Sequence, residues 1–359
     1  MKALFVFNHP APYKVHIFNE LNKLFPIQVV FERTKAKDRP DSFYSENEYN
    51  FPVYFLKRGA FGLENSYSGE LKKFIKKHHN EYDVIVMNGY SKVAEMRAIR
   101  YMIKHDIPYV LQINGGVIKK ESKFKRNLKT YFISNAYRYY SPCLKADEYL
   151  IYYGAYKEHI YHYPYGNYFS NEILKSVPSQ STKQKLREKW HLPSGPLFIN
   201  ASQFIERKNN IQLIELFKHR TETLLLVGAG QEKDTYEQII KKNNMKNIII
   251  MDFKSKKDLF EIMSACDFFV TLSREDIFGH TTLEAMANAL PVISSDKVVS
   301  SVEIIRNGKN GFLVDINDEA SIVNALDNVI SLSPKEALKT AQKNTFEQSA
   351  AAINELLRK

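Results

Sequence analysis

The chain has 359 residues, of which 44% are hydrophobic and 25% are charged. This composition is typical of a soluble globular protein and excludes a disordered, collagen-like or coiled-coil chain, while the length indicates two domains. The two cysteines, Cys143 and Cys266, are too few for a disulfide scaffold or a zinc site built on cysteines. No apolar run is long enough to span a membrane, and the run after Lys2 is too short for a signal peptide. We therefore expect a cytoplasmic protein.

Positive charge is concentrated in the first half of the chain. The net charge is +11, and residues 1–172 alone hold 26 basic and 17 acidic residues. The densest stretch, 119–145, has eight basic residues against one acid, with aromatic residues between them. This pattern predicts an acidic partner, and two interpretations stay open: a helix on an anionic membrane surface, or a solvated helix packed on its own domain. Nucleic acid is disfavoured because no nucleic-acid-binding motif accompanies the stretch.

Short apolar runs alternate with helical patterns along the chain. In the first half, runs at 3–7, 27–31, 83–87 and 109–113 predict strands, and an apolar stripe over 13–25 predicts a helix. In the second half, strands are predicted at 197–200, 224–227, 248–251, 268–271 and 291–294, with helices at 211–217, 234–241, 257–265 and 282–288. This alternation is typical of α/β domains with parallel sheets.

The pattern predicts two Rossmann-like doubly wound domains in tandem. We expect a first domain at 1–172, a polar linker with a short helix at 173–195, and a second domain at 196–339. Two such domains place a ligand cleft between them, at the carboxyl ends of the strands.

The segment 271–315 holds the residues best suited to chemistry. Thr281 or Thr282 can cap a helix that starts there, and the free N–H groups of its N-terminus favour an anion. Gly279 lets a phosphate approach the backbone closely. Asp276 lies in the preceding loop and Glu284 inside the helix, eight residues further on. Carboxylates in these positions can accept hydrogen bonds from the vicinal hydroxyls of a sugar or a ribose.

This segment resembles the nucleotide-sugar motif of retaining GT-B glycosyltransferases of family 4, of the bacterial surface-polysaccharide type. The resemblance lies in Asp276, Phe278-Gly279, Glu284-Ala285-Met286-Ala287 and Pro291-Val292-Ile293, and it continues through Glu303 and 307–312. Upstream, 201–210 resembles the family's phosphate-binding loop and 226–230 its next strand and turn, so the match covers about 196–330. It implies a GT-B fold, in which two Rossmann-like domains face each other across a cleft and the last helix, 340–359, packs back on the first domain.

The resemblance implies a role at the donor for each matching residue. Lys208 would neutralise the donor diphosphate, Asp276 would bind hydroxyls of the donor sugar, and Glu284 would bind the ribose hydroxyls. These three are the candidate catalytic residues. The further candidate donor-binding residues, which hold the sugar or phosphate or flank the nucleobase, are Gln203, Arg207, Glu275, Phe278, Gly279, His280, Thr281, Thr282, Met251 and Phe253.

Two positions depart from the family pattern. The loop acid is Asp276 where the family commonly has Glu, and Glu275 beside it is an alternative for the same role. Many members have Arg five residues before the lysine, where this chain has Gln203, and Arg207 can supply the missing charge. Neither departure alters the expected class of reaction.

The first half matches the family more loosely. Residues 8–20 resemble the opening strand–helix turn of polysaccharide-assembling members, and Asn114 stands where some members carry a histidine beside the transferred sugar. The resemblance implies that the first domain binds the acceptor. The candidate acceptor residues are His9, Pro12, Tyr13, Asn114, Gly115 and Gly116.

The resemblance further implies sugar transfer, with retention, from a nucleotide-diphospho-sugar, of UDP rather than GDP, to a saccharide. The chain has no Asp-x-Asp tripeptide. We therefore expect no metal and no other cofactor, and we assign the diphosphate charge to Lys208, Arg207 and a helix N-terminus. The basic first half favours a lipid-diphosphate-linked acceptor and a peripheral place on the inner face of the cell membrane, in surface-polysaccharide synthesis. Two alternatives stay open: a nucleotide-sugar epimerase of the same fold, and a non-catalytic carbohydrate- or membrane-binding protein.

Overall fold

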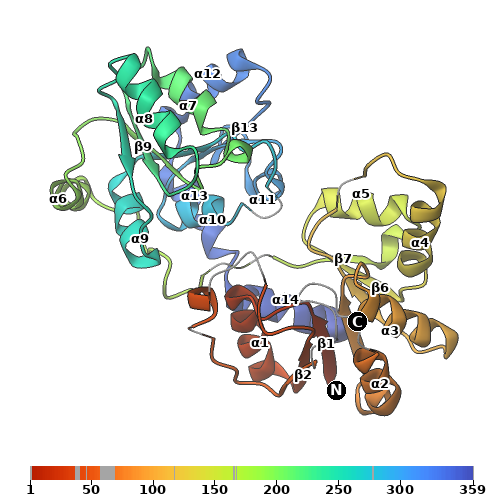
Figure 1. Ribbon diagram of the computed structural model, residues 1–359. Coiled ribbons are helices and arrows are strands. Elements are labelled where there is room, and N and C mark those ends of the chain that lie inside the picture. The colour runs from red at the N-terminus through yellow and green to blue at the C-terminus, as the bar shows by residue number, and fades with distance from the viewer. Residues whose placement is uncertain are drawn as a thin grey trace. The chain divides into compact units, whose positions relative to one another are not determined.

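The computed structural model describes residues 2–36, 41–45, 47–56, 69–116, 118–164, 166, 168–276 and 279–358. It divides into two compact units, Met1–Gly166 with Thr345–Lys359, and Asn167–Asn344 (Figure 1). Each unit has its own parallel sheet with helices on both faces. The prediction of two Rossmann-like α/β domains is therefore confirmed.

The sheet of the first unit has seven parallel strands among the described residues, in the order β3-β2-β1-β4-β5-β6-β7. The strands are β1 (Ala3–Phe7), β2 (Ile27–Phe31), β3 (Val53–Phe55), β4 (Val84–Asn88), β5 (Val110–Gln112), β6 (Arg138–Ser141) and β7 (Ile160–His162). The helices are α1 (Pro12–Leu24), α2 (Glu70–His78), α3 (Val93–Lys104), α4 (Lys123–Ser134), α5 (Leu144–Tyr152) and α14 (Phe346–Arg358). The strand order reverses between β1 and β4, and open α/β sheets bind ligands at the carboxyl ends of the strands at such a point.

The C-terminal helix α14 is part of the first unit and packs beside α1 (Figure 1). The ring centroids of His16 and Phe346 are 5.0 Å apart across this contact. Ser349 Oγ donates a hydrogen bond to the Pro164 carbonyl at 2.6 Å and accepts one from the Gly166 N–H at 2.8 Å. The last segment of the chain is thereby tied to the end of the seven-stranded unit, 183 residues away in sequence.

The segment 340–359, expected as the last helix, contains the end of one helix and the whole described length of another. The first, α13 (Pro334–Gln342), belongs to the second unit, and α14 begins at Phe346. The break follows from capping, because Thr345 Oγ1 accepts a hydrogen bond from the Gln348 N–H at 3.2 Å and so starts a new helix.

The sheet of the second unit has the order β10-β9-β8-β11-β12-β13, again parallel. Its strands are β8 (Leu197–Ala201), β9 (Thr223–Val227), β10 (Ile248–Met251), β11 (Phe268–Thr271), β12 (Val292–Ser295) and β13 (Gly311–Val314). Its remaining helices are α6 (Gln180–Trp190), α7 (Asn210–Phe217), α8 (Lys233–Lys242), α9 (Lys256–Ala265), α10 (His280–Ala287), α11 (Val299–Ile304) and α12 (Glu319–Asn328).

Alternate residues of the central strand β8 enter two separate cores. Leu197 and Ile199 pack in one apolar cluster, whereas Phe198 between them packs in the other. Side chains of a strand point to opposite faces in turn, so a run that is apolar at every position is buried on both faces. This is why the continuous apolar runs of the sequence appear as central parallel strands.

The short helix expected within 173–195 is α6, and it belongs to the second unit. Lys183 Nζ and Arg187 Nη2 each lie 2.7 Å from a carboxylate oxygen of Asp267, at the start of β11. Arg187 Nε also donates to the Ala265 carbonyl at 2.9 Å. These contacts fix the segment on the second unit, which begins at Asn167 rather than at the expected residue 196.

Candidate functional site

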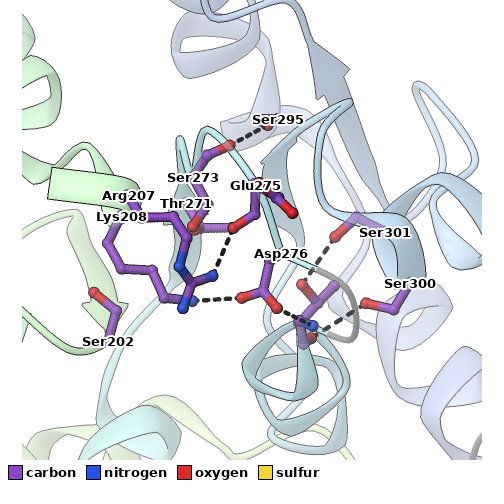
Figure 2. Close-up of polar contacts among 12 residues, drawn as sticks. Ser202, Arg207, Lys208, Thr271, Ser273, Glu275, Asp276, Ser295, Ser300 and Ser301 are labelled. Atoms are coloured by element: carbon purple, nitrogen blue, oxygen red, sulfur yellow. Dashed lines mark hydrogen bonds and ion pairs between the residues drawn. The ribbon is translucent and has the colours of Figure 1, made fainter. Parts of the chain in front are cut away.

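Lys208 and Asp276 form an ion pair near the carboxyl ends of two neighbouring strands (Figure 2). Lys208 ends the short 3₁₀ turn Glu206–Lys208 after β8, and Asp276 lies in the loop after β11. Because β8 and β11 pair in parallel, their following loops meet at one edge of the sheet. The two side chains are only 13% and 18% exposed, so the ion pair is largely shielded from water.

Gly279 holds the backbone turn that starts α10. Its φ of +48° lies in the left-handed region, and a Cβ there would stand 2.3 Å from Val298 Cγ1. Its N–H donates to Asp276 Oδ1 at 3.0 Å, and its carbonyl accepts from Ser300 Oγ at 3.3 Å (Figure 2). Asp276 therefore occupies the helix N-terminus, where the helix dipole favours an anion.

The prediction that Thr281 or Thr282 caps this helix was wrong. Helix α10 begins at His280 with Gly279 as its N-cap, and no side chain caps it. Thr282 is buried, and its Oγ1 lies 2.9 Å from Ser301 Oγ, which in turn accepts from Ser294. A threonine inside the first turn points its hydroxyl at the neighbouring helix α11 and so cannot reach the free N–H groups.

Arg207 is placed differently from its neighbour Lys208. Arg207 Nη1 donates to the backbone carbonyl of Glu275 at 2.6 Å (Figure 2). The Arg207 carbonyl accepts from the Arg274 N–H at 2.9 Å. The side chains of Arg207, Glu275 and Gln203 are exposed. In this structure Arg207 fixes the loop after β11, whereas Lys208 contacts an acid directly.

Glu284 lies on α10, four residues after its start, and is partly buried. Its carboxylate makes no hydrogen bond or ion pair with any described residue. Burial raises the pKa of this carboxyl to about 7, against the opposing influence of the Lys256 ammonium. A partly buried carboxylate in an apolar setting is stabilised when the hydroxyl groups of a ligand donate hydrogen bonds to it.

The other candidate donor residues are more scattered. Met251 ends β10 and packs against one apolar core, while the Phe253 side chain is 77% exposed. His280 and Thr281 are partly exposed in the first turn of α10. Phe278 lies outside the residues that the structure describes.

Four candidate acceptor residues line one cavity in the first unit, of about 340 Å³: His9, Tyr13, Asn114 and Gly115. The cavity lies at the carboxyl ends of β1, β4 and β5, where the strand order reverses. Asn114 Nδ2 donates to Asn88 Oδ1 at 3.1 Å in its wall. The sequence therefore located a pocket of ligand size.

Pro12 and Gly116 do not line this cavity. Pro12 is the first residue of α1, and a Cβ on Gly116 would stand 2.4 Å from the Tyr149 ring, so this glycine allows close packing instead. Sequence reasoning missed Lys14, Lys92 and Tyr149, all of which do line it. A lysine within a helical pattern looks like a surface residue, and no signal in the sequence distinguishes it.

No helix in the described ranges is both long and apolar enough to cross a bilayer. In the same part of the chain, no group of three or more His, Cys, Asp or Glu side chains is placed to hold a metal ion.

Residues 182–348 match the family described as glycosyl transferases group 1. The chain is 31% identical over 153 residues to an uncharacterized glycosyltransferase of Methanocaldococcus jannaschii, a match that covers 43% of this chain and 42% of that protein. It is 26% identical to EpsD of Bacillus subtilis (strain 168), itself provisionally named a glycosyltransferase, over 86% of this chain and 84% of EpsD.

The fold is similar to a solved structure along its whole length. The crystal structure of Anabaena HepE in complex with UDP superimposes with a TM-score of 0.76 at 18% identity, and the match covers 99% of this chain and 98% of that one. The two parallel-sheet units are therefore those of the GT-B fold. These similarities support a glycosyltransferase with this fold, and residues 182–348 match the group 1 glycosyl transferases.

Proposed function

We propose that the protein transfers a sugar from a UDP-sugar to a saccharide acceptor, with retention of anomeric configuration, in the synthesis of a surface polysaccharide. The second unit binds the donor and the first unit binds the acceptor. The observation that supports this most is the Lys208–Asp276 ion pair beside the Gly279 N–H at the start of α10. It places a cation, a carboxylate and a helix N-terminus together, as a sugar diphosphate requires.

The proposed chemistry follows from the charge of the leaving group. The bond between the anomeric carbon and the diphosphate oxygen breaks, and the acceptor oxygen forms a new bond on the same face. The acceptor's hydroxyl proton passes to the departing phosphate. Negative charge grows on the diphosphate as it leaves, and Lys208 and the N-terminus of α10 are suited to stabilise that charge. Asp276 holds the Lys208 ammonium in place until the donor arrives, and it then offers its oxygens to the sugar hydroxyls.

Glu284 is proposed to bind the ribose of the donor. Its carboxylate stands one turn into α10 without a hydrogen-bonding partner among the described residues, and ribose offers two adjacent hydroxyls as donors. UDP is the proposed nucleotide because the similar Anabaena structure is described as a complex with UDP.

We also propose that α4 and α5 bind an anionic membrane surface, which would present a lipid-diphosphate-linked acceptor. Of the twelve large apolar side chains that are exposed among the described residues, eight lie between 118 and 156. They include Phe124, which is 76% exposed. Lys119, Lys120, Lys123 and Lys125 are exposed in the same stretch. Exposed apolar side chains among basic ones suit the boundary of an anionic bilayer, and they support the proposed peripheral location on the inner face of the cell membrane.

A panel of nucleotide sugars tests the proposed reaction. The full chain is incubated with UDP-, GDP- and ADP-sugars, with and without lipid-diphosphate-linked saccharides, and the products are identified by mass spectrometry and NMR. We expect release of UDP that depends on the acceptor, and a product with the donor's anomeric configuration. An isomerised sugar without an acceptor would instead identify an epimerase, and an inverted product would contradict retention.

A further inference from the structure

Buried hydroxyl groups surround the loop after β11 and the start of α10. They share an exposed fraction of 5% or less and lie on or beside β11, β12, α10 and α11: Thr271, Ser273, Thr282, Ser294, Ser295 and Ser301. Each of them takes part in at least one hydrogen bond. A hydroxyl in a core costs free energy unless it is bonded, and a buried network in which every member is bonded fixes one geometry.

Ser301 joins three elements of this network. It lies on α11 and has an exposed fraction of 0%. Its Oγ accepts a hydrogen bond from Ser294 Oγ at 2.8 Å, which ties it to β12. The same oxygen lies 2.9 Å from Thr282 Oγ1, in the first turn of α10. The Ser301 hydroxyl therefore connects a strand inside the sheet to the N-terminal end of α10.

The chain at the start of α11 also holds the loop after β11. The Asp276 N–H donates to the Lys297 carbonyl at 3.2 Å, and the Val299 N–H donates to the Asp276 carbonyl at 2.9 Å. Ser300 Oγ donates to the Gly279 carbonyl at 3.3 Å (Figure 2). The start of α11 is thus bonded both to the loop acid and to the residue that precedes α10.

The first turn of α10 is oriented from outside the helix. Among the described residues, no side chain caps this helix. A capping side chain would fix the first turn but would also occupy its free N–H groups, whereas an uncapped helix leaves them available for an anion. The contact between Thr282 and Ser301 supplies the constraint without covering those N–H groups, because the hydroxyl of Thr282 is directed at α11.

We propose that Ser301 is a positioning residue for the donor diphosphate: through Thr282 it holds the first turn of α10 so that the N–H groups of that turn face the diphosphate. The inference rests on the proposed function, because it concerns the site assigned to the donor. Ser301 has no exposed surface of its own, so it acts on the ligand only through the helix. Its effect is directed at the phosphates of the donor rather than at the nucleoside.

The other end of α10 offers a matched control. Ser264, on α9, is 6% exposed, and its Oγ donates to Oδ1 of Asn288, the residue that follows the helix, at 2.7 Å. Ser264→Ala and Ser301→Ala each remove one buried hydroxyl that bonds to α10 or to its cap. Both variants should therefore lower the free energy of unfolding, whereas only Ser301→Ala alters the end of the helix that is assigned to the diphosphate.

NMR titration of the full chain with UDP and with uridine tests the inference. Uridine has the base and ribose of UDP but no phosphate, so the ratio of the two dissociation constants measures the contribution of the diphosphate. Ser301→Ala should weaken UDP binding about two- to fivefold, the range that a helix N-terminus contributes to binding an anion, and should leave uridine binding unchanged. Ser264→Ala should keep the wild-type ratio. An unchanged ratio in Ser301→Ala, or an equal change in Ser264→Ala, would overturn the inference.

Two further variants separate positioning from a loss of stability. Thr282→Val breaks the same contact but leaves Ser301 bonded to Ser294, and it should reduce the ratio as Ser301→Ala does. The double variant Thr282→Val/Ser301→Ala leaves no hydroxyl at this contact without its partner, so it should regain stability in urea unfolding compared with Ser301→Ala. Its ratio should nevertheless stay low. A ratio that recovers together with stability would show that Ser301 has only a structural role.

The same titrations separate this inference from the proposed function. If the wild type binds UDP more tightly than uridine and the Ser301 and Thr282 variants keep that preference, the inference alone is wrong. If the wild type does not bind UDP, the proposed donor is wrong and the inference falls with it.

Discussion

Lys208 and Asp276 are 68 residues apart in the sequence and form a shielded ion pair in the second unit. The same carboxylate accepts the Gly279 N–H, so one acid joins the loop after β8 to the start of α10. A donor diphosphate that enters this site competes for the Lys208 ammonium. The pair keeps the cation oriented in the empty protein, and such preorganisation favours stabilisation of charge that develops during the reaction.

Lys208→Ala should damage catalysis more than Arg207→Ala does. A lysine beside the leaving diphosphate contributes more in the transition state than in the ground state, so kcat should fall by more than KM rises. Arg207 is exposed and bonds to a backbone carbonyl, so its loss should cost much less. Steady-state kinetics with the preferred UDP-sugar compare the two variants. If Arg207→Ala proves the more harmful, Arg207 rather than Lys208 is the residue that stabilises the leaving diphosphate.

Glu284→Gln should weaken UDP binding by about 1.5–3 kcal/mol, the cost of losing a hydrogen bond to a charged group. In the wild type, the ribose hydroxyls of bound UDP would donate hydrogen bonds to the Glu284 carboxyl, and such bonds favour its ionised form. With an empty-state pKa of about 7, affinity for UDP should therefore fall as pH drops below neutral. Calorimetry between pH 5.5 and 8.5 measures both effects. The variant should show a flatter pH profile than the wild type, and identical profiles would remove Glu284 from the ribose site.

Sugar transfer should survive treatment with EDTA. The expectation rests on the absence of an Asp-x-Asp tripeptide from the sequence and on the position of Lys208 beside the N-terminus of α10. These groups would stabilise the leaving diphosphate by themselves. Rates are measured with and without chelator. A complete loss of activity that Mg²⁺ or Mn²⁺ restores would refute this account.

The first unit should bind anionic vesicles in a salt-sensitive way. Each basic residue near an anionic surface contributes about 1 kcal/mol. Changing the exposed Lys119, Lys120, Lys123 and Lys125 to Glu should therefore abolish co-sedimentation at low salt. Lys129 is unsuitable for this test because its Nζ lies 2.7 Å from Glu121 Oε2 and its side chain is only 27% exposed.

The matched control for vesicle binding is a variant with the same change of charge in the second unit. The exposed residues Lys218, Lys241, Lys242 and Lys246 serve this purpose when changed to Glu. The control should still sediment with vesicles that contain anionic lipid. Wild-type protein that stays in the supernatant at low salt would disprove the membrane proposal.

Glu32→Gln should stabilise the protein at alkaline pH. Glu32 and Glu95 are buried beside each other, and burial together with their mutual repulsion holds the pKa of Glu32 well above its usual range. The folded state then binds more protons than the unfolded state, so stability is full below the usual carboxyl pKa and falls as pH rises through neutrality.

The size of this effect is on the order of 1–3 kcal/mol between pH 5 and pH 8.5. Urea unfolding at both pH values measures it, and the variant should lose less stability than the wild type on going to pH 8.5. Glu148→Gln, on the exposed face of α5, is the control and should behave as the wild type does. If the free energy of unfolding depends on pH equally in all three proteins, Glu32 does not have a raised pKa in the folded state.

The strands that the sequence predicts best are the central ones. The runs at 3–7, 27–31 and 268–271 coincide with β1, β2 and β11, because a parallel strand buried on both faces is apolar at nearly every position. The run at 248–251 coincides with the edge strand β10. The sequence does not predict β3, β6, β7 or β13. These have three or four residues each, and β6 and β7 contain Arg138 and His162, so pairing with a neighbour rather than apolarity defines them.

The residues of the donor motif could be named from the sequence, but their partners could not. The resemblance to the family motif pointed to Lys208, Asp276 and Glu284, whereas the ion pair depends on β8 and β11 being neighbours in the sheet. The cap of α10 was assigned to the wrong residue type, because the left-handed turn at Gly279 starts the helix earlier than the threonines suggest.

Lys14 shows most clearly what only the tertiary structure decided. In the sequence it is one lysine among the polar residues of an amphipathic helix, and helical periodicity places it toward solvent. In the structure, side chains from β1, α1 and the segment after β7 enclose it. Local pattern determines which elements form, because periodicity is a property of neighbouring residues. Burial of a single charge depends on distant segments that meet only when the sheet is assembled, and so it is decided by the fold.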